Sequence, residues 1–124
     1  MILKLLPPSF TICKLSPKET IPDWAIQSEY FFLAKTSDEL SIICSGKDIP
    51  EEVKGDKGWR CFRVDGDLEF DQIGVVASVS APIANAGISL FLVSTHDRDY
   101  VFVHKDNLTQ SIQIYQEHGF AIEK

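Results

Sequence analysis

Two carboxylates and a histidine in the second half of the chain could do chemistry on a small polar molecule. Asp71, His96 and Asp99 are of the types that enzymes use for general acid–base catalysis. The same region also suits binding without reaction, because backbone N–H groups at a helix start attract a carboxylate and acidic oxygens attract an ammonium group. Residues 71–74 could supply both kinds of contact, and Ser89 brings a hydroxyl into an otherwise apolar run.

No fingerprint of a known enzyme class accompanies these residues. The sequence contains no G-x-G-x-x-G, G-x-x-x-x-G-K-[ST], G-x-S-x-G or H-E-x-x-H pattern. His96, His104 and His118 do not have the spacing of a metal site, and the three cysteines form no C-x-x-C pair. The cysteines lie in apolar runs, which favours reduced thiols packed in a core. We therefore expect no metal, no cofactor and no catalysis.

Length and charge limit the classes of partner. The chain has 124 residues, of which 44% are hydrophobic, enough for one compact domain or two small units. Its 12 basic and 18 acidic residues give a net charge of −6, so nucleic acid is not an expected partner. The apolar opening, residues 1–6, is far shorter than a membrane span or a signal-peptide core. We expect a cytoplasmic protein without membrane contact.

A helix is expected directly after Asp71. Small apolar side chains recur over residues 73–87 at three- and four-residue steps, which places them on one helical face. Asp71 suits the N-cap, and Gly87 should end the helix. Pro82 removes one backbone hydrogen bond, so the last turn should be bent or separately started.

The remainder of the second half alternates strands with one more helix. Three runs are rich in β-branched and aromatic side chains and have the composition of strands: residues 59–64, 88–94 and 100–104. The polar residues 95–99 suit a hairpin turn. A second helical stripe follows Asp106 over residues 108–119, and residues 120–122 can close the sheet. This βαββαβ order predicts an α+β, ferredoxin-like unit of four antiparallel strands with both helices on one face.

The first half contains a shorter set of elements. Three apolar runs have the composition of strands: residues 11–15, 31–36 and 40–45. Between the first two, prolines allow at most a short helix that begins near Asp23 and turns Trp24 and Ile26 inward. A reduced version of the second half is therefore expected here.

An internal repeat links the two halves. The hairpin of residues 32–43 corresponds to the hairpin of residues 91–103 after one gap. We predict two ferredoxin-like units with antiparallel sheets and helices on one face, an abbreviated one over residues 1–58 and a complete one over residues 59–124.

Several segments together resemble a known family. They are residues 38–41 (DELS), 58–60 (GWR), 74–79 (GVVASV), 81–84 (APIA), 86–89 (AGIS), 94–95 (ST) and 99–100 (DY). In these segments the chain is similar to the small ACT-domain proteins of bacteria related to the CASTOR-type arginine sensors. The resemblance implies two tandem ACT units, an amino acid bound at an interface between units, and a regulatory role without a cofactor.

The resemblance also implies which residues bind the ligand. In the animal arginine sensors of this family the ligand lies between two ACT units. Three groups of positions carry over: Glu69, Asp71, Gln72 and Gly74 in the loop after the first strand, Ser89 and Leu90 on the second strand, and Thr95, His96 and Asp99 at the hairpin. Because the first unit is abbreviated, we expect a second chain to complete the site.

Other functions stay open at this point. Asp71, His96 and Asp99 could act together in a small enzyme, or the chain could be a structural dimerisation module without a ligand. The same residues also suit structural roles: Asp71 as a helix cap, Ser89 as a partner of a backbone group, and residues 96–99 as a solvated turn. An exposed hydrophobic strand edge and an open sheet face favour a homodimer.

Overall fold

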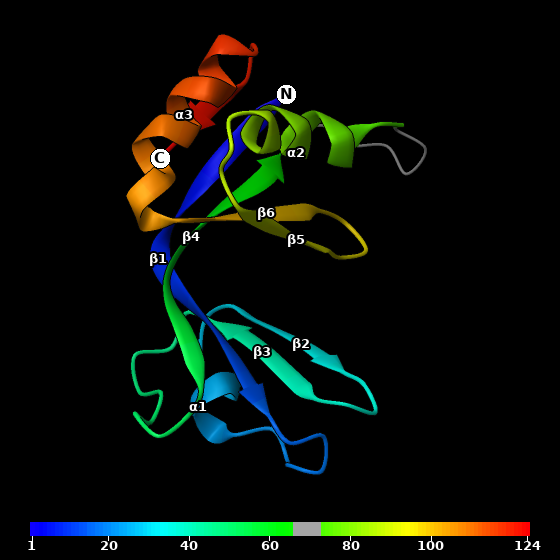
Figure 1. The fold of residues 1–124 in the computed structure, drawn as a ribbon, viewed down its shortest axis with the longest axis vertical. Helices are drawn as coiled ribbons and strands as arrows, with labels where there is room; N and C mark the ends of the chain where they lie inside the picture. Colours follow the sequence, from blue (N-terminus) through cyan, green and yellow to red (C-terminus); the bar gives the residue numbers. More distant parts are fainter. Residues whose placement is uncertain (66–72) are drawn as a thin grey trace. The chain divides into compact units, whose positions relative to one another are not determined.

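Two compact units make up the computed structural model, which describes residues 1–65 and 73–124 (Figure 1). The larger unit contains Met1–Pro7 and Trp59–Lys124, and the smaller unit contains Pro8–Gly58. The first seven residues thus lie in the larger unit, not in the N-terminal unit that the sequence suggested.

Two long strands, β1 (Ile2–Leu15) and β4 (Gly55–Asp65), each contribute residues to both units. β1 begins well before the expected strand of residues 11–15. Its early part is stable as a strand because apolar side chains alternate there, and the larger unit buries Leu3 and Leu5.

The sheet of the larger unit has the strand order β5-β6-β4-β1-β7, with β5 over Leu90–Ser94, β6 over Asp99–His104 and β7 over Ala121–Glu123. β6 pairs antiparallel with both β4 and β5. β7 pairs parallel with β1, where Ile2 lies opposite Ala121. The sequence suggested four antiparallel strands; the N-terminal strand adds a fifth between β4 and β7.

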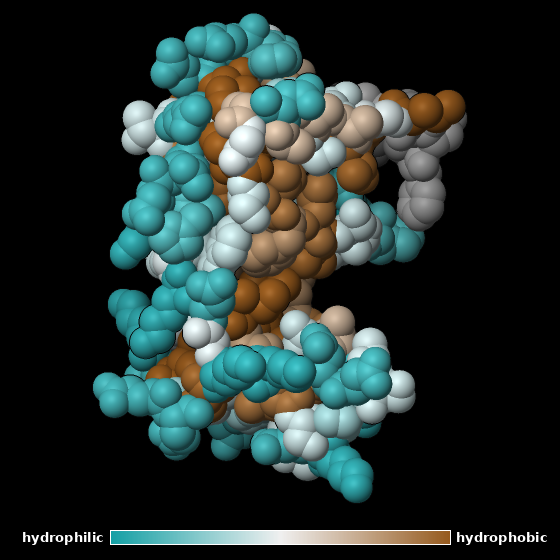
Figure 2. All heavy atoms as spheres, in the orientation of Figure 1, coloured by the Kyte–Doolittle hydropathy of each residue, from teal (hydrophilic) through white to brown (hydrophobic). Residues whose placement is uncertain are grey.

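Two helices, α2 (Val75–Asn85) and α3 (Leu108–Glu117), cover one face of this sheet (Figure 1). A 3₁₀ turn, Lys105–Asn107, leads into α3. Figure 2 shows hydrophilic side chains along the outer side of α3 and hydrophobic ones beneath the two helices. The buried core is Leu3, Leu5, Phe62, Val64, Val75, Val79, Ile83, Ile88, Val101, Val103 and Tyr115. The α+β class and the βαββαβ order of this half are confirmed.

The ends of α2 differ in part from expectation. Gly74 occupies the N-cap with a left-handed φ of 83° and no side-chain cap, so the helix begins after it; Asp71 lies outside the described residues. Pro82 lies inside α2, which continues past it to Asn85, so the last turn is not a separately started helix. The expected end is confirmed: the N–H of Gly87 donates to Ala84 and that of Ile88 donates to Ile83, a Schellman motif.

The smaller unit has the strand order β2-β3-β1, with β2 over Phe31–Lys35 and β3 over Leu40–Cys44. The single helical turn α1 (Asp23–Ile26) packs on one side of these strands. Its core is Cys13, Ala25, Leu40, Ile42 and Cys44, with Trp24 packed against it. The expectation for Ile26 was wrong: this side chain is 51% exposed and Ala25 takes the inward position.

The repeated hairpins close in the same way. In the smaller unit the N–H of Thr36 donates to the carbonyl of Glu39 at 2.9 Å, and in the larger unit the N–H of Thr95 donates to that of Arg98 at 2.8 Å. Each threonine hydroxyl also accepts a hydrogen bond from a backbone N–H of its own turn. The turn chemistry of the repeat is therefore the same in both units.

Candidate functional site

Charged side chains gather at the end of the larger unit where β4 stops and the β5–β6 turn reverses the chain. Arg63 donates two hydrogen bonds to the carboxylate of Asp65, at 2.7 and 2.9 Å. Arg98 lies 3.5 Å from the same carboxylate and donates to the carbonyl of Val64. The hydrogen bonds from Arg63 hold the pKa of Asp65 below its ordinary value, so this carboxylate stays ionised.

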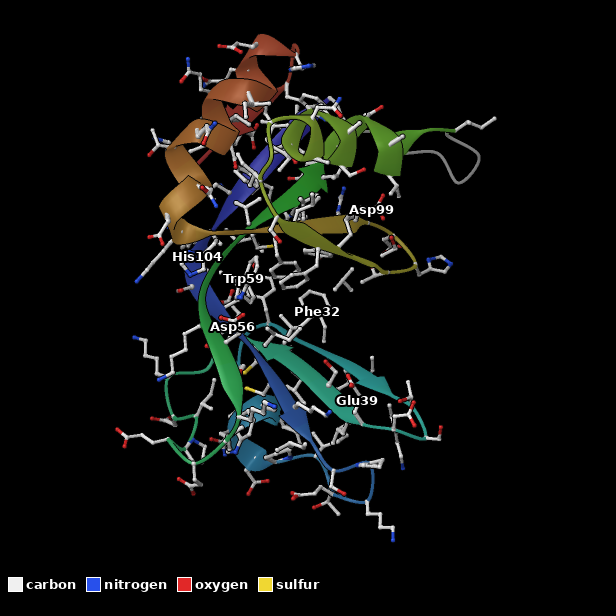
Figure 3. The ribbon with its side chains drawn as sticks, in the orientation of Figure 1. Phe32, Glu39, Asp56, Trp59, Asp99 and His104 are labelled. Atoms are coloured by element: carbon white, nitrogen blue, oxygen red, sulfur yellow. The ribbon has the colours of Figure 1, made fainter. Side chains whose placement is uncertain are left out.

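A second carboxylate stands next to Arg98. Asp99 begins β6 opposite Ser94 and accepts a hydrogen bond of 2.5 Å from the Ser94 hydroxyl (Figure 3). In the part of the chain that the structure describes, Asp99 makes no ion pair. One of its oxygens is thus oriented by Ser94, and the other can accept from a cation.

The start of α2 adds hydrogen-bond donors. The first N–H group with a partner inside the helix is that of Ser78, which donates to Gly74 at 2.9 Å. The N–H groups of the preceding helical turn therefore point outward at the positive end of the helix dipole. In Figure 1 this start of α2 and the β5–β6 turn lie on the same side of the larger unit. We call Arg63, Asp65, Ser94, Arg98 and Asp99 the turn-end cluster.

The structure brings together some of the residues that the sequence selected. Gly74, Thr95, His96 and Asp99 lie at the side of the larger unit that carries the turn-end cluster. Ser89 directly precedes β5 and Leu90 begins it, at the end of the strand opposite Ser94 and about 13 Å from it along the strand. Leu90 packs against the core. Glu69, Asp71 and Gln72 lie outside the described residues.

Four members of the turn-end cluster were not selected from the sequence: Arg63, Asp65, Ser94 and Arg98. The alternation of Arg63 and Asp65 at a strand end was a usable signal, because side chains two apart lie on the same strand face. The contact with Arg98 required the β4–β6 pairing, which places Arg63 opposite Tyr100.

Among the described residues, each unit also has a pocket whose walls include no member of the turn-end cluster. The larger unit has a groove of about 610 Å³ between α2 and the end of α3, with Ala81, Pro82, Asn85, His118 and Phe120 on its walls. The smaller unit has a pocket of about 280 Å³ around β1, with charged side chains on its walls.

The three cysteines occupy the core positions that the sequence predicted. All three cysteines are free and buried, as expected for core residues, and burial raises the pKa of Cys13 to about 11. Within residues 1–65 and 73–124, no three His, Cys, Asp or Glu side chains come together as a metal site. Over the same residues, no helix combines the length and apolar character that crossing a membrane requires.

The class of protein follows from the fold together with a family match. The model of the ACT domain family matches residues 54–117, which is slightly more than half of the chain. A second model, of an N-terminal domain, matches residues 8–52. The chain belongs to the ACT domain family.

The chain is also similar to individual proteins. The chain is 37% identical over 59 residues to the human protein named cytosolic arginine sensor for mTORC1 subunit 1, a match that covers 47% of this chain and 18% of that protein. A crystal structure of an Agrobacterium tumefaciens protein is 38% identical with a TM-score of 0.92, covering 98% of this chain and 90% of that one.

The chain is also similar to a more distant solved structure, and this similarity concerns only the fold. The ligand-free regulatory subunit of aspartate kinase from Thermus thermophilus has a TM-score of 0.62 at 12% identity, covering 93% of this chain and 95% of that one. The antiparallel α+β architecture is therefore that of ACT regulatory domains.

Proposed function

We propose that this chain is a cytoplasmic, non-enzymatic regulatory module that binds a free amino acid, a tandem ACT protein of the CASTOR type. The larger unit supplies the ligand site at its turn-end cluster. The observation that carries the proposal is the pair Arg98 and Asp99: opposite charges on adjacent residues, held by separate partners beside the start of α2.

The chemistry of an amino acid fits these groups. Its carboxylate can accept hydrogen bonds from the N–H groups at the start of α2 that have no partner inside the helix, where the helix dipole favours negative charge. Its ammonium group, or a cationic side chain, can bind the oxygen of Asp99 that Ser94 leaves available. Because Arg98 already contacts Asp65, the ligand does not have to neutralise that guanidinium.

A second copy of the chain would complete the site. β5 is the last strand in the order of the larger unit, so its outer backbone groups have no partner strand among the described residues of that unit. Pairing of this edge with another chain would make a homodimer and bring a second ACT unit next to the turn-end cluster. Sedimentation velocity at micromolar concentration tests this part: a strict monomer, with or without ligand, would contradict it.

Thermal-shift screening with each of the twenty amino acids tests binding. A ligand at 100 times its Kd adds about 2.7 kcal/mol of apparent stability, which is readily detected. Asp99→Asn should abolish the shift, whereas the matched control Asp97→Asn, exposed in the same turn, should retain it. If no amino acid raises the melting temperature, the binding proposal fails, and dimerisation without any response would instead favour a structural module.

No catalytic step is part of the proposal. The enzyme alternative required His96 to act with Asp71 and Asp99. The His96 ring is 80% exposed, and its Nδ1 lies 2.7 Å from Asp97. No geometry in the described residues favours this alternative.

A further inference from the structure

We propose that the smaller unit carries a second binding site, for a small zwitterion with an amino-acid head group, in its pocket of about 280 Å³. This site is separate from the turn-end cluster and stands independently of it. The side chains that carry the inference are Lys14, Glu39, Ser41, Lys54 and Asp56, which all line the pocket.

The strand register places these groups around one central lysine. Lys14 lies on β1 opposite Ser41 of β3, and Glu39 precedes Ser41 by two residues, which puts it on the same strand face. On the other side of β1, the N–H of Lys14 donates to the carbonyl of Lys54 at 3.0 Å, so the segment 54–56 runs alongside. Lys14 therefore has an acidic residue from a different segment on either side, Glu39 and Asp56.

The charged side chains of the pocket lie on the strand face opposite the core cluster that contains Cys13 and Leu40. Cys13 and Leu40, the neighbours of Lys14 and Ser41 in sequence, point into the core, so alternation directs Lys14 and Ser41 to the opposite side. Glu39 and Ser41 are half-buried, which lowers their contact with water, while the lysines remain exposed and can adjust to a ligand. Asp56 is exposed like the lysines, so the pocket has one half-buried and one exposed carboxylate.

The charged residues that line the pocket favour a ligand that carries both a positive and a negative charge. Two ammonium groups and two carboxylates line the pocket, and none of the four makes an ion pair among the described residues. A simple anion would be attracted by the lysines and repelled by Glu39 and Asp56, and a simple cation would meet the reverse. A zwitterion can place its carboxylate at Lys14 and its ammonium group at a flanking carboxylate, and so interact favourably with both.

Gly55 keeps the wall of the pocket close to β1. A Cβ at this position would lie 3.1 Å from Cγ2 of Thr11 and 3.4 Å from Sγ of Cys13. A larger residue would push the segment 54–56 outward and move Asp56 away from Lys14. The volume of about 280 Å³ lies just below the range of drug-sized pockets, which suits a molecule of few atoms.

Amide chemical-shift titration of the full chain with glycine, the smallest amino-acid zwitterion, tests the proposal. Acetate and methylammonium, which each carry one of its two charges, serve as comparison probes. Glycine should give saturable shifts at residues 12–14, 39–41 and 54–56, and each single-charge probe should bind at least roughly tenfold more weakly. Equal shifts with glycine and with the single-charge probes, or shifts that never saturate, would overturn the site.

Matched variants sharpen the test. Lys14→Met and Glu39→Gln should each weaken glycine binding at these amides by roughly tenfold or more. Lys18→Met removes an exposed lysine of the same unit and should change nothing. Unchanged binding in Lys14→Met, in a chain whose spectrum is otherwise that of the folded protein, would refute the assignment.

The same spectra separate this proposal from the first one. Shifts confined to Gly74 and residues 94–99 would support the turn-end cluster and overturn the second site. Shifts confined to the smaller unit would do the opposite.

Discussion

The phenol of Tyr115 donates a hydrogen bond of 2.5 Å to the backbone carbonyl of Val79, in the interior of the larger unit. Tyr115 is fully buried, and its ring meets that of Phe62 edge-on with 5.3 Å between centroids. This single side chain thus ties α3 to α2 and both helices to β4. Burial raises the pKa of the phenol, so the hydroxyl remains a donor at any ordinary pH.

Loss of this hydroxyl should cost stability. Tyr115→Phe should lower the free energy of unfolding by about 1–2 kcal/mol, because the Val79 carbonyl loses a buried partner while the ring packing is kept. Urea denaturation measures the change. Tyr30→Phe is a suitable control, since its hydroxyl makes no hydrogen bond within the described residues, and an unchanged midpoint for Tyr115→Phe would contradict the assigned role.

Lowering the pH should reduce the free energy of unfolding of the larger unit, because Asp65 becomes protonated. The pKa of Asp65 is lowered in the folded state by its hydrogen bonds from Arg63, so its stabilisation is fully present above the unfolded pKa of about 3.9. That contribution is lost as the pH falls through the lower, folded pKa. Asp65→Asn should therefore flatten the acid limb of a plot of unfolding free energy against pH.

The control for this experiment is Asp48→Asn, which removes an exposed carboxylate of the smaller unit. It should keep the slope of the unmodified chain. If the acid limb of Asp65→Asn were identical to that of the unmodified chain, the ion pair with Arg63 would contribute nothing to the free energy of unfolding.

The end of α2 should depend on the backbone of Gly87. Its φ of 77° lies in the left-handed region, and a Cβ at this position would touch nothing within 4 Å. Gly87→Ala should therefore cost about 1–2 kcal/mol from backbone strain alone, and Gly87→Asn less, because asparagine adopts this region more readily. Thermal unfolding of the two variants side by side tests the order, and an alanine variant as stable as the unmodified chain would contradict it.

The cysteines should react slowly in the folded chain. Burial raises the pKa of Cys13 to about 11 and raises that of Cys61 as well, so almost no thiolate exists at pH 8. Alkylation by iodoacetamide, followed by intact-mass spectrometry, should be slow until urea is added. Rapid labelling of Cys13 without denaturant would mean that the core of the smaller unit opens readily.

Features that depend on residues close together in the sequence were predictable. The hairpin of β5 and β6, the Schellman end of α2 at Gly87 and the buried cysteines follow from local pattern and turn residues. The prediction of Asp71 as the N-cap of α2 was wrong, because Gly74, a glycine in the left-handed region, occupies that position. Ile26 was misjudged because a four-residue helix is too short for its periodicity to define a face.

The order of elements in the second half and the alternation of apolar side chains were determined by the sequence alone, since each depends on residues a few positions apart. Tertiary structure decided that β1 enters between β4 and β7, and that Arg98 reaches the carboxylate beside Arg63. Both depend on pairing between segments far apart in the chain. Many registers satisfy the same apolar pattern, and the shared core selects one of them.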